Sequence, residues 1–378
     1  MTIKIGSGAT PRGGKGVYQE QGTALVRSQN VYDLRFNPEG LAHISDDAAA
    51  ALKGVTVSAG DVLINITGES VTRTCLVDVD VLPARVSQHV AIVRPRPNKL
   101  DSRYLLYSLI NPQIKAILNT LSEAGATRRA LTKGHLESLE ILLPPLREQV
   151  RIADALSAFD ELIETNRRLA NDLENLARIC ASRPTRRVPL GDVAGVPHLR
   201  QRQPQGVVDH YSIPAYDSGI LPNRESADLI LSGKQVLETD SVLISRLNPT
   251  AARTWMVYPS KDVPSVCSPE FVVVRGTAGV PAEVLWALAS RQDFWDQMQS
   301  SVGGTTNSRQ RVDKAAIPSF LVPDPRELGA RQAQAIGLTV QVASELRREA
   351  QKVALQRDEL VPLLVSGNVR VLDSETVD

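Results

Sequence analysis

Hydrophobic residues follow two kinds of spacing along the chain. In residues 1–146 they form short β-branched runs separated by Gly, Pro and Asn, which predict a mixed α/β fold. The runs that we expect to be strands are Val55–Val57, Val62–Ile66 and Val90–Val93. Over Asp101–Leu121 the apolar residues recur at helical spacing, so we expect a helix there that is broken or kinked at Pro112.

After Pro144 and Pro145 the spacing alternates between three and four residues, as in one seam of a coiled coil. The seam runs through Arg147–Ala181 and consists of Ile152, Leu156, Phe159, Ile163, Asn166, Ala170, Leu173, Ala177 and Cys180. At about 1.5 Å per residue such a helix spans roughly 50 Å. Because globular helices average about 11–12 residues, this length favours a connector between domains over a packing helix inside one domain.

The second half of the chain repeats the landmarks of the first at a separation of about 179 to 181 residues. The matched pairs are Asp61–Ile64 with Asp240–Ile244, His89–Val93 with Glu270–Val274, Gly125–Arg128 with Gly304–Asn307, and Leu143–Leu146 with Val322–Pro325. This period is too long for a solenoid and has the size of one domain plus one connecting helix. The sequence therefore predicts a pseudo-twofold internal repeat.

A second long helix is predicted from about Glu327 to Leu364. One candidate seam contains Ile336, Val340, Ala343, Ala350, Ala354 and Val361, interrupted by Arg347 and Arg357, and a neighbouring seam contains Val342, Leu346, Val353 and Leu360. Neither long helix can bury its seam alone, so we expect the two to pair antiparallel. The predicted fold class is α+β, with two α/β domains joined by two long antiparallel coiled-coil helices. The predicted parts are residues 1–146, the helix 147–183, residues 184–325, the helix 326–366 and a flexible tail 367–378.

Composition narrows the possible functions only slightly. The chain has 378 residues, of which 42% are hydrophobic and 22% charged, and a formal net charge of +1 neither requires nor excludes nucleic acid. The three cysteines are far apart and form no CxxC pair, so we expect reduced thiols in a cytoplasmic protein and no zinc site. An apolar leader and an 18-residue apolar run are both missing, so we expect no membrane association.

Familiar catalytic motifs are also missing from the sequence. It contains no Walker A loop, no HExxH, no GxSxG and no Asn-Pro-Pro-aromatic tetrad of the kind that holds a flipped base in amino-methyltransferases. This pattern favours a non-catalytic binding subunit over an enzyme.

Polar loops supply the candidate contacts to nucleic acid. Gly125–Gly134 carries three cations and no acid, and Gly303–Arg311 occupies the matching place in the second half. Small residues let a backbone approach a partner, and Arg, Gln and Asn suit phosphate or base edges. The candidates are Arg27, Ser28, Gln29, Asn30, Gln88, His89, Thr127, Arg128, Arg129, Thr132 and Lys133 in the first half, and Tyr216, Ser218, Arg246, Asn248, Thr305, Thr306, Asn307, Arg309 and Arg311 in the second. The alternative for each loop is a solvated turn, and for His89 a structural histidine.

The segment Leu142–Gln149, running into Ile152–Asp160 and Asn166–Leu169, resembles the specificity (S) subunit of type I restriction-modification systems. Ser7–Pro11, Gly60–Ile64, Ser87–His89 and Gly125–Arg128 are similar to the target recognition domain of that family. The resemblance covers nearly the whole chain and both repeats. The second junction, Val322–Glu327, lacks the Pro-Pro-Leu-x-Glu-Gln pattern of the first.

This resemblance implies a non-catalytic reader of double-stranded DNA, in which each target recognition domain reads half of a split asymmetric sequence and the long helices set the spacer. It implies two methyltransferase (M) subunits and two restriction (R) subunits as partners for adenine methylation or cleavage. It implies no cofactor in this chain, with S-adenosylmethionine on the M subunits and ATP and Mg on the R subunits. Two other hypotheses remain open: a coiled-coil adaptor or DNA-binding module of another defence assembly, and a stand-alone DNA methyltransferase or nuclease.

Overall fold

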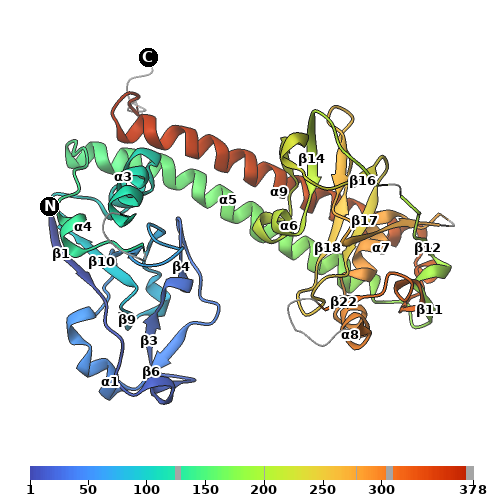
Figure 1. Ribbon diagram of the computed structural model, residues 1–378, viewed down its shortest axis with the longest axis horizontal. Helices are drawn as coiled ribbons and strands as arrows, with labels where there is room; N and C mark the ends of the chain where they lie inside the picture. The colour runs from blue at the N-terminus through green and yellow to red at the C-terminus, as the bar shows by residue number, and fades with distance from the viewer. Residues whose placement is uncertain (124–128, 200, 278, 304–309, 372–378) are drawn as a thin grey trace. The chain divides into compact units, whose positions relative to one another are not determined.

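The computed structural model describes residues 1–123, 129–199, 201–277, 279–303 and 310–371. Contacts divide the chain into two compact units. Unit 1 consists of Met1–Glu161 and Ala354–Asp378, and unit 2 of Leu162–Val353. The division falls inside the two long helices, so each unit contains one segment of each helix (Figure 1).

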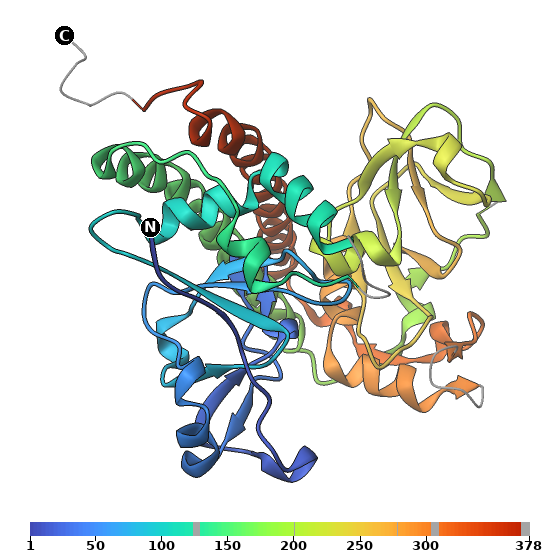
Figure 2. The same cartoon turned by 60° about the vertical axis from the view of Figure 1, so that its left-hand side comes forward.

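Unit 1 is built on two four-stranded sheets (Figures 1 and 2). The first has the order β1-β10-β7-β8 and is antiparallel throughout. The second has the order β2-β6-β3-β9, and its β3 and β9 run parallel. The strands are β1 (Thr2–Ser7), β2 (Tyr18–Gln19), β3 (Thr23–Val26), β6 (Ala42–Ile44), β7 (Val62–Asn65), β8 (Thr74–Leu76), β9 (Ala84–Val86) and β10 (Val90–Pro95), with a separate hairpin of β4 (Val31–Tyr32) and β5 (Arg35–Phe36).

Side chains of β7 alternate between two cores, which explains why Val62, Leu63 and Ile64 are all apolar and all buried. Val62 and Ile64 pack with Tyr104 and other residues of α2, whereas Leu63 packs with Val26 and other residues of the second sheet.

The helices of unit 1 before the long ones are α1 (Asp46–Ala51), α2 (Ser102–Ile110), α3 (Pro112–Glu123) and α4 (Lys133–Glu137).

Two expectations for this half need comment. The predicted helix Asp101–Leu121 is two helices separated at Asn111, because Pro112 begins α3 and has no N–H to continue α2. The predicted strand Val55–Val57 is wrong, since Lys53–Val55 forms a 3-10 turn and Thr56 makes only an isolated bridge to Arg85.

Unit 2 contains a four-stranded antiparallel sheet, β12-β20-β17-β18, and a five-stranded mixed sheet, β13-β16-β19-β14-β15. These strands are β12 (Ala194–Gly195), β13 (Gln201–Arg202), β14 (Val207–Tyr211), β15 (Asn223–Ser226), β16 (Lys234–Leu237), β17 (Ser241–Ser245), β18 (Thr254–Val257), β19 (Ser265–Cys267) and β20 (Phe271–Gly276). Two small pairs are β11 (Arg187–Pro189) with β23 (Leu321–Pro323), and β21 (Val302–Gly303) with β22 (Arg311–Val312). The short helices are α6 (Ile213–Gly219), α7 (Ala282–Ala289) and α8 (Gln292–Ser300).

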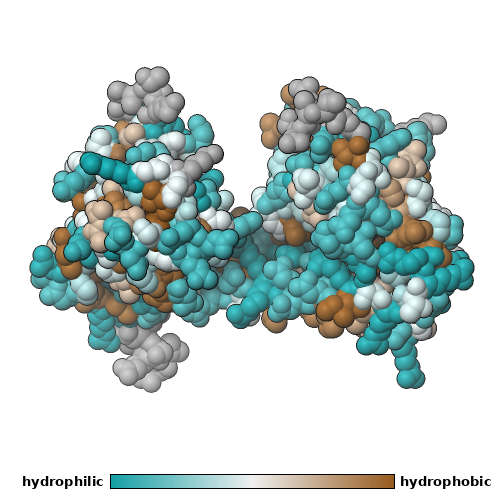
Figure 3. All heavy atoms as spheres, turned by 90° about the horizontal axis from the view of Figure 1, so that it is seen from below, coloured by the Kyte–Doolittle hydropathy of each residue, from teal (hydrophilic) through white to brown (hydrophobic). Residues whose placement is uncertain are grey.

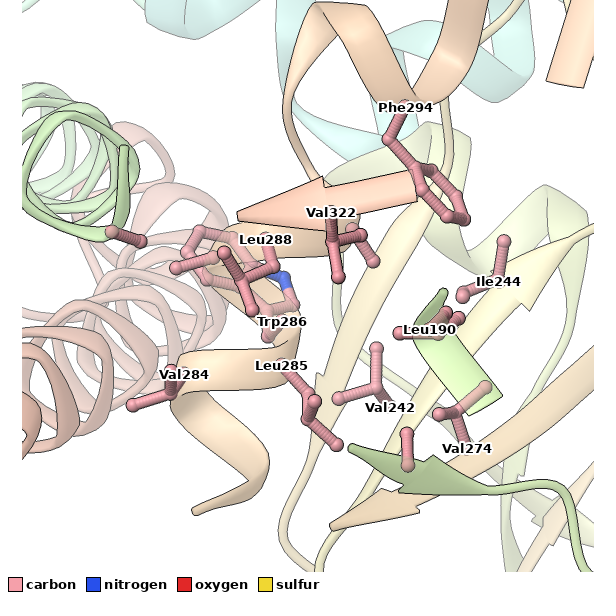
Figure 4. Packing of buried hydrophobic residues seen from close by; sticks show 14 of the residues in the cluster. Leu190, Val242, Ile244, Val274, Val284, Leu285, Trp286, Leu288, Phe294 and Val322 are labelled. Atoms are coloured by element: carbon pink, nitrogen blue, oxygen red, sulfur yellow. The ribbon is translucent and has the colours of Figure 1, made fainter. Parts of the chain in front are cut away.

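The main core of unit 2 lies between α7 and one face of the four-stranded sheet. Figure 4 shows Leu285 and Trp286 of α7 among Val242, Val274 and Val322, all of which belong to one buried cluster. On the other face, Leu243 packs with Trp255 and with residues of the five-stranded sheet. β17 therefore alternates between two cores in the same way as β7.

The four-stranded sheets of the two units have matching strand orders and registers. Val62 lies opposite Val93 and Leu76, and Val242 lies opposite Val274 and Met256. In this register Asp61 corresponds to Ser241, one residue later than the sequence pairing of Asp61 with Asp240. Both residues accept a hydrogen bond from an arginine: Nε of Arg94 donates to the Asp61 carboxylate at 2.6 Å, and Nε of Arg275 donates to the Ser241 hydroxyl at 3.1 Å.

The long helices are α5 (Leu146–Ala181) and α9 (Ala330–Val365). In unit 1, Leu156 of α5 and Val361 of α9 share a core, and Arg357 donates to Asp160 at 2.5 Å. In unit 2, Ala177 and Val340 share a core. Every predicted seam residue of α5, Asn166 included, is buried or half-buried. The second seam predicted on α9 is wrong at Val342, which is 44% exposed.

Candidate nucleic-acid interface

In unit 1 the ends of several strands meet at one edge of the sheets. The Ser87 N–H donates to the Val26 carbonyl at 2.9 Å, and the Asn65 side-chain amide donates to the Ser28 carbonyl at 2.9 Å. The Ile66 N–H donates to the His89 carbonyl at 2.9 Å. These bonds bring the predicted Ser28 and Gln88–His89 segments together with Asn65–Thr67, although the three are far apart in the sequence.

The segment before α4 completes this edge. Leu131 N–H donates to the Ile66 carbonyl at 2.8 Å, and Gly68 N–H donates to the Arg129 carbonyl at 3.1 Å. We call residues 65–68, 87–89 and 129–131 the unit 1 polar edge. Thr127 and Arg128, which precede the last segment, lie outside the described residues.

The exposed side chains of the unit 1 polar edge contain both donors and acceptors. The Thr67 hydroxyl lies 2.6 Å from Nδ1 of His89, and Nε2 of Gln88 lies 3.3 Å from Nε2 of the same ring. Gln88 and His89 are both exposed, and while these two contacts engage both ring nitrogens of His89, the carbonyl oxygen of the Gln88 amide remains available as an acceptor. Arg129 is held by Asn119 at 2.6 Å and by Glu123 at 3.4 Å.

Other predicted residues of the first half have local structural roles. Thr132 caps α4 by accepting from the His135 N–H at 3.1 Å, and Lys133, 61% exposed, lies 3.3 Å from Glu137. Arg27 donates to the Gly40 carbonyl at 2.6 Å, and the exposed Gln29 reaches the same carbonyl at 3.4 Å.

The prediction of Asn30 as a surface contact is wrong. Its side chain is fully buried, accepts from the Arg27 N–H at 3.1 Å and donates to the Asn37 and Glu39 carbonyls at 2.9 and 3.3 Å. These bonds use both its acceptor and its donor groups. Asn30 therefore holds the turn that presents Ser28 and Gln29.

Unit 2 has an equivalent edge with a different set of side chains. Arg246 N–H donates to the Glu270 carbonyl at 3.1 Å and Val312 N–H to the Arg246 carbonyl at 3.0 Å, which repeats the backbone bonds of Ile66. Asn248 N–H donates to the Gln310 carbonyl at 2.9 Å, as Gly68 does to Arg129. We call residues 245–248, 268–270 and 310–312 the unit 2 polar edge.

Charged side chains gather on the unit 2 polar edge. The Glu270 carboxylate accepts from Arg311 at 2.9 Å and lies 3.5 Å from Arg246. Arg311 is 49% exposed and Arg246 is 31% exposed, so both guanidinium groups retain solvent-facing N–H groups. The sequence predicted both arginines but missed Glu270. The only signal for Glu270 was that it matches His89 when the two halves of the sequence are compared.

The remaining predicted residues of the second half divide into three groups. Tyr216 packs against Trp255, with the two ring centres 5.4 Å apart, and its hydroxyl donates to the Thr254 carbonyl at 3.4 Å. Burial raises the pKa of this phenol to about 12. Ser218 is exposed, and its hydroxyl donates to the Ala215 carbonyl at 3.0 Å. Thr305, Thr306, Asn307 and Arg309 lie outside the described residues.

A family model for the type I restriction modification DNA specificity domain matches residues 17–175. Over these residues the chain is similar to a type I restriction-modification DNA specificity domain. Two curated relatives from Methanocaldococcus jannaschii agree: the type I restriction enzyme MjaX specificity subunit is 34% identical over 146 residues, and the MjaVIII specificity subunit is 26% identical over 159 residues. These matches cover 38% and 41% of this chain but only 34% and 37% of the relatives' own lengths.

A solved type I restriction-modification S subunit from M. genitalium is similar to nearly the whole chain. The similarity covers 97% of this chain and 95% of that one, with a TM-score of 0.52 and 16% identity. At this identity the match shows a shared fold. The resemblance expected from the sequence is therefore confirmed for the specificity domain, and the fold similarity extends over unit 2.

The structure explains two motifs that the sequence resemblance singled out, Leu142–Gln149 and Ser7–Pro11. Gln149 is 1% exposed, accepts from the Asp101 N–H at 2.9 Å and donates to the Lys99 and Pro144 carbonyls at 3.1 and 2.8 Å. It thereby fixes the first turn of α5 to the globular part. At Gly8 a Cβ atom would lie 2.2 Å from the Ser87 carbonyl oxygen, so only glycine lets this segment pass beside the polar edge.

Neither a membrane span nor a metal site appears in the part of the chain that the structure describes. None of its helices combines the length and the apolar character that crossing a bilayer requires. Within the same residues, no group of three or more His, Cys, Asp or Glu side chains is arranged to hold a metal ion.

Proposed function

We propose that this chain is the DNA sequence-specificity subunit of a type I restriction-modification complex, and that it binds a bipartite, asymmetric DNA target. Each unit contacts one half-site through its polar edge. The observation that carries this proposal is one backbone arrangement, present in both units, with different side chains on it. His89 occupies the place in unit 1 that Glu270 occupies in unit 2. A backbone arrangement that the two units share, with different polar side chains on each, suits the reading of two different half-sites.

The side chains on the polar edges match the chemistry of base edges. Arginine can bind guanine with two hydrogen bonds, glutamine can bind adenine in the same way, and a carboxylate can accept from the amino group of cytosine. Gln88 supplies such an amide in unit 1, and Arg246, Glu270 and Arg311 supply the charged groups in unit 2. Backbone contacts to phosphate would set the register of each unit on the duplex.

The outer face of α5 supports the proposed docking of methyltransferase subunits. Leu162, Leu169 and Leu176 are 44%, 45% and 49% exposed and recur every seven residues within unit 2. Apolar residues at this interval fit a helix from another protein. Figure 3 shows a mainly hydrophilic surface with separate hydrophobic patches. In this proposal two M subunits dock on the long helices and two R subunits complete the complex, with S-adenosylmethionine, ATP and Mg bound by those partners.

The proposal is tested by selection from a random duplex pool with the complex of this chain and its M subunits. We expect enrichment of one sequence in two parts separated by a fixed spacer, and the same two parts at methylated adenines in the methylome of the source organism. Failure to enrich any sequence would exclude the proposal. Methyl transfer by this chain alone would instead favour a stand-alone enzyme.

Variants separate DNA reading from a purely adaptor role. Arg311→Ala removes a charged donor of the unit 2 polar edge and should relax selection in one half-site only, at a cost of about 1–3 kcal/mol for the affected base pair. Charge reversal at Arg128, Arg129 and Lys133 should weaken DNA binding. An adaptor that binds only protein would keep its partners through both changes and show no altered DNA preference.

A further inference from the structure

A cationic cluster on unit 1 lies outside the residues that the sequence singled out. The guanidinium carbon of Arg73 lies 4.7 Å from the ring centre of Tyr32, and that of Arg35 lies 5.3 Å from the same centre. Tyr32 and Arg35 belong to the β4–β5 hairpin, and Arg73 immediately precedes β8. We call Tyr32, Arg35 and Arg73 the Tyr32 cluster.

Neither guanidinium of the Tyr32 cluster has a carboxylate partner among the described residues. The nearby Asp33 is engaged elsewhere: its carboxylate accepts from the Thr74 N–H at 3.1 Å and forms an ion pair with Lys115. Arg35 is exposed, and Arg73 and Tyr32 are half-buried. Two positive groups therefore lie against one aromatic ring, and no carboxylate of the described residues pairs with either of them.

In unit 2 the arginine at the matching position has a carboxylate partner. Arg253 has the backbone position of Arg73, since the Ser245 N–H donates to its carbonyl at 3.0 Å as the Asn65 N–H donates to that of Arg73 at 2.9 Å. Arg253, however, donates two hydrogen bonds to Asp217, at 2.6 and 2.8 Å. This arginine is neutralised within its own unit, whereas Arg73 is not.

The Tyr32 cluster adjoins the unit 1 polar edge. The Asn65 amide donates to the Val31 carbonyl at 3.3 Å and to the Ser28 carbonyl at 2.9 Å, so β4 begins beside the end of β7. Guanidinium groups bind phosphate oxygens through paired N–H donors, and an aromatic face can hold such groups in a fixed orientation. A bound phosphate would also supply the anionic partner that both arginines lack among the described residues.

We propose that Arg35 and Arg73, held on Tyr32, form a binding site for a DNA backbone phosphate next to the unit 1 polar edge. Unit 2 has no such site at the matching position, because Asp217 occupies Arg253. The inference rests on the proposed function and deepens it: the two units differ in how they grip the backbone as well as in the bases that they read.

The test is the salt dependence of DNA binding by the complex with M subunits, with random-sequence duplex DNA as the probe. Arg35→Gln combined with Arg73→Gln should lower the slope of log Kd against log salt by about 1, because the loss of one phosphate contact removes about one unit. Between 50 and 200 mM salt the wild type should then lose about fourfold more affinity than the variant. Arg35→Lys with Arg73→Lys should keep the wild-type slope.

Arg253→Gln is the matched control, since it removes the same type of side chain from the equivalent position in unit 2. It should leave the slope unchanged. An unchanged slope in the Arg35 and Arg73 double glutamine variant, with wild-type thermal stability, would overturn the phosphate site, and so would an equal fall in the control. If the wild-type complex enriches no sequence while its slope still depends on these arginines, the proposed function fails and the phosphate site remains.

Discussion

Replacement of Gln149 by alanine tests how the specificity domain is joined to its long helix. The buried Gln149 amide makes three hydrogen bonds, one from the Asp101 N–H and two to the Lys99 and Pro144 carbonyls. A net value of about 1 kcal/mol per bond predicts a loss of roughly 3 kcal/mol, with a range of about 2–4 because unpaired buried groups remain. The neighbouring chain cannot supply replacement donors, since Pro144 and Pro145 leave no backbone N–H at those positions.

The assay is thermal unfolding of the full chain. For a domain of this size, about 3 kcal/mol corresponds to a fall in Tm of roughly 6–12 °C in the transition of unit 1. Gln356→Ala is the control, because Gln356 is an exposed glutamine on α9 in the same unit and should shift stability by less than about 0.5 kcal/mol. Equal Tm values for the two variants would refute the reasoning.

Three further outcomes follow from buried polar groups. Arg347→Ala should cost about 1–3 kcal/mol, because Arg347 and Glu174 are 11% and 13% exposed and lie 2.9 Å apart; exchanging the two residues should recover part of this loss in a double-mutant cycle. Asn30→Ala should lower the unfolding free energy by about 2–4 kcal/mol in a denaturant titration without changing protein fold, and wild-type stability would contradict its role in the turn. Burial raises the pKa of Cys75 from its usual 9.0 to about 12, so the native thiol should resist a thiol reagent at pH 8. The stability that folding gains from keeping this thiol neutral should decline as pH rises from 9.0 towards 12. Rapid labelling of Cys75 in the folded protein would contradict this expectation.

The elements with a strong periodic signal were predictable from the sequence. The seam of α5 follows from spacing alone, and its polar Asn166 is buried as the pattern requires. Pro112 separates α2 from α3 because proline has no backbone N–H to continue the hydrogen bonds of α2. On α9 the wider apolar stripe was misleading, since Val342 is 44% exposed although its spacing suits a seam. Periodicity identifies a face that can be buried, and only a packing partner decides whether it is.

The candidate site was less predictable because its residues come from distant parts of the chain. Sequence pattern brought Gln88, His89, Arg246 and Arg311 to attention, and hydrogen bonds between strand ends place them on two equivalent edges. The same pattern also selected Asn30, which is buried and bonded to the backbone. It passed over Arg35 and Arg73, since nothing local marks two arginines as neighbours on one tyrosine ring.

The sequence by itself therefore determined the two long helices and the strand runs at Val62–Ile66 and Val90–Val93, because these depend on the order and spacing of neighbouring residues. Tertiary structure decided which polar side chains are available to a ligand. Asn30 and Tyr216 are turned inward, whereas Arg73 lacks the carboxylate that neutralises Arg253 at the matching position. The charge and accessibility of a group depend on contacts across the fold, and spacing along the chain does not encode them locally.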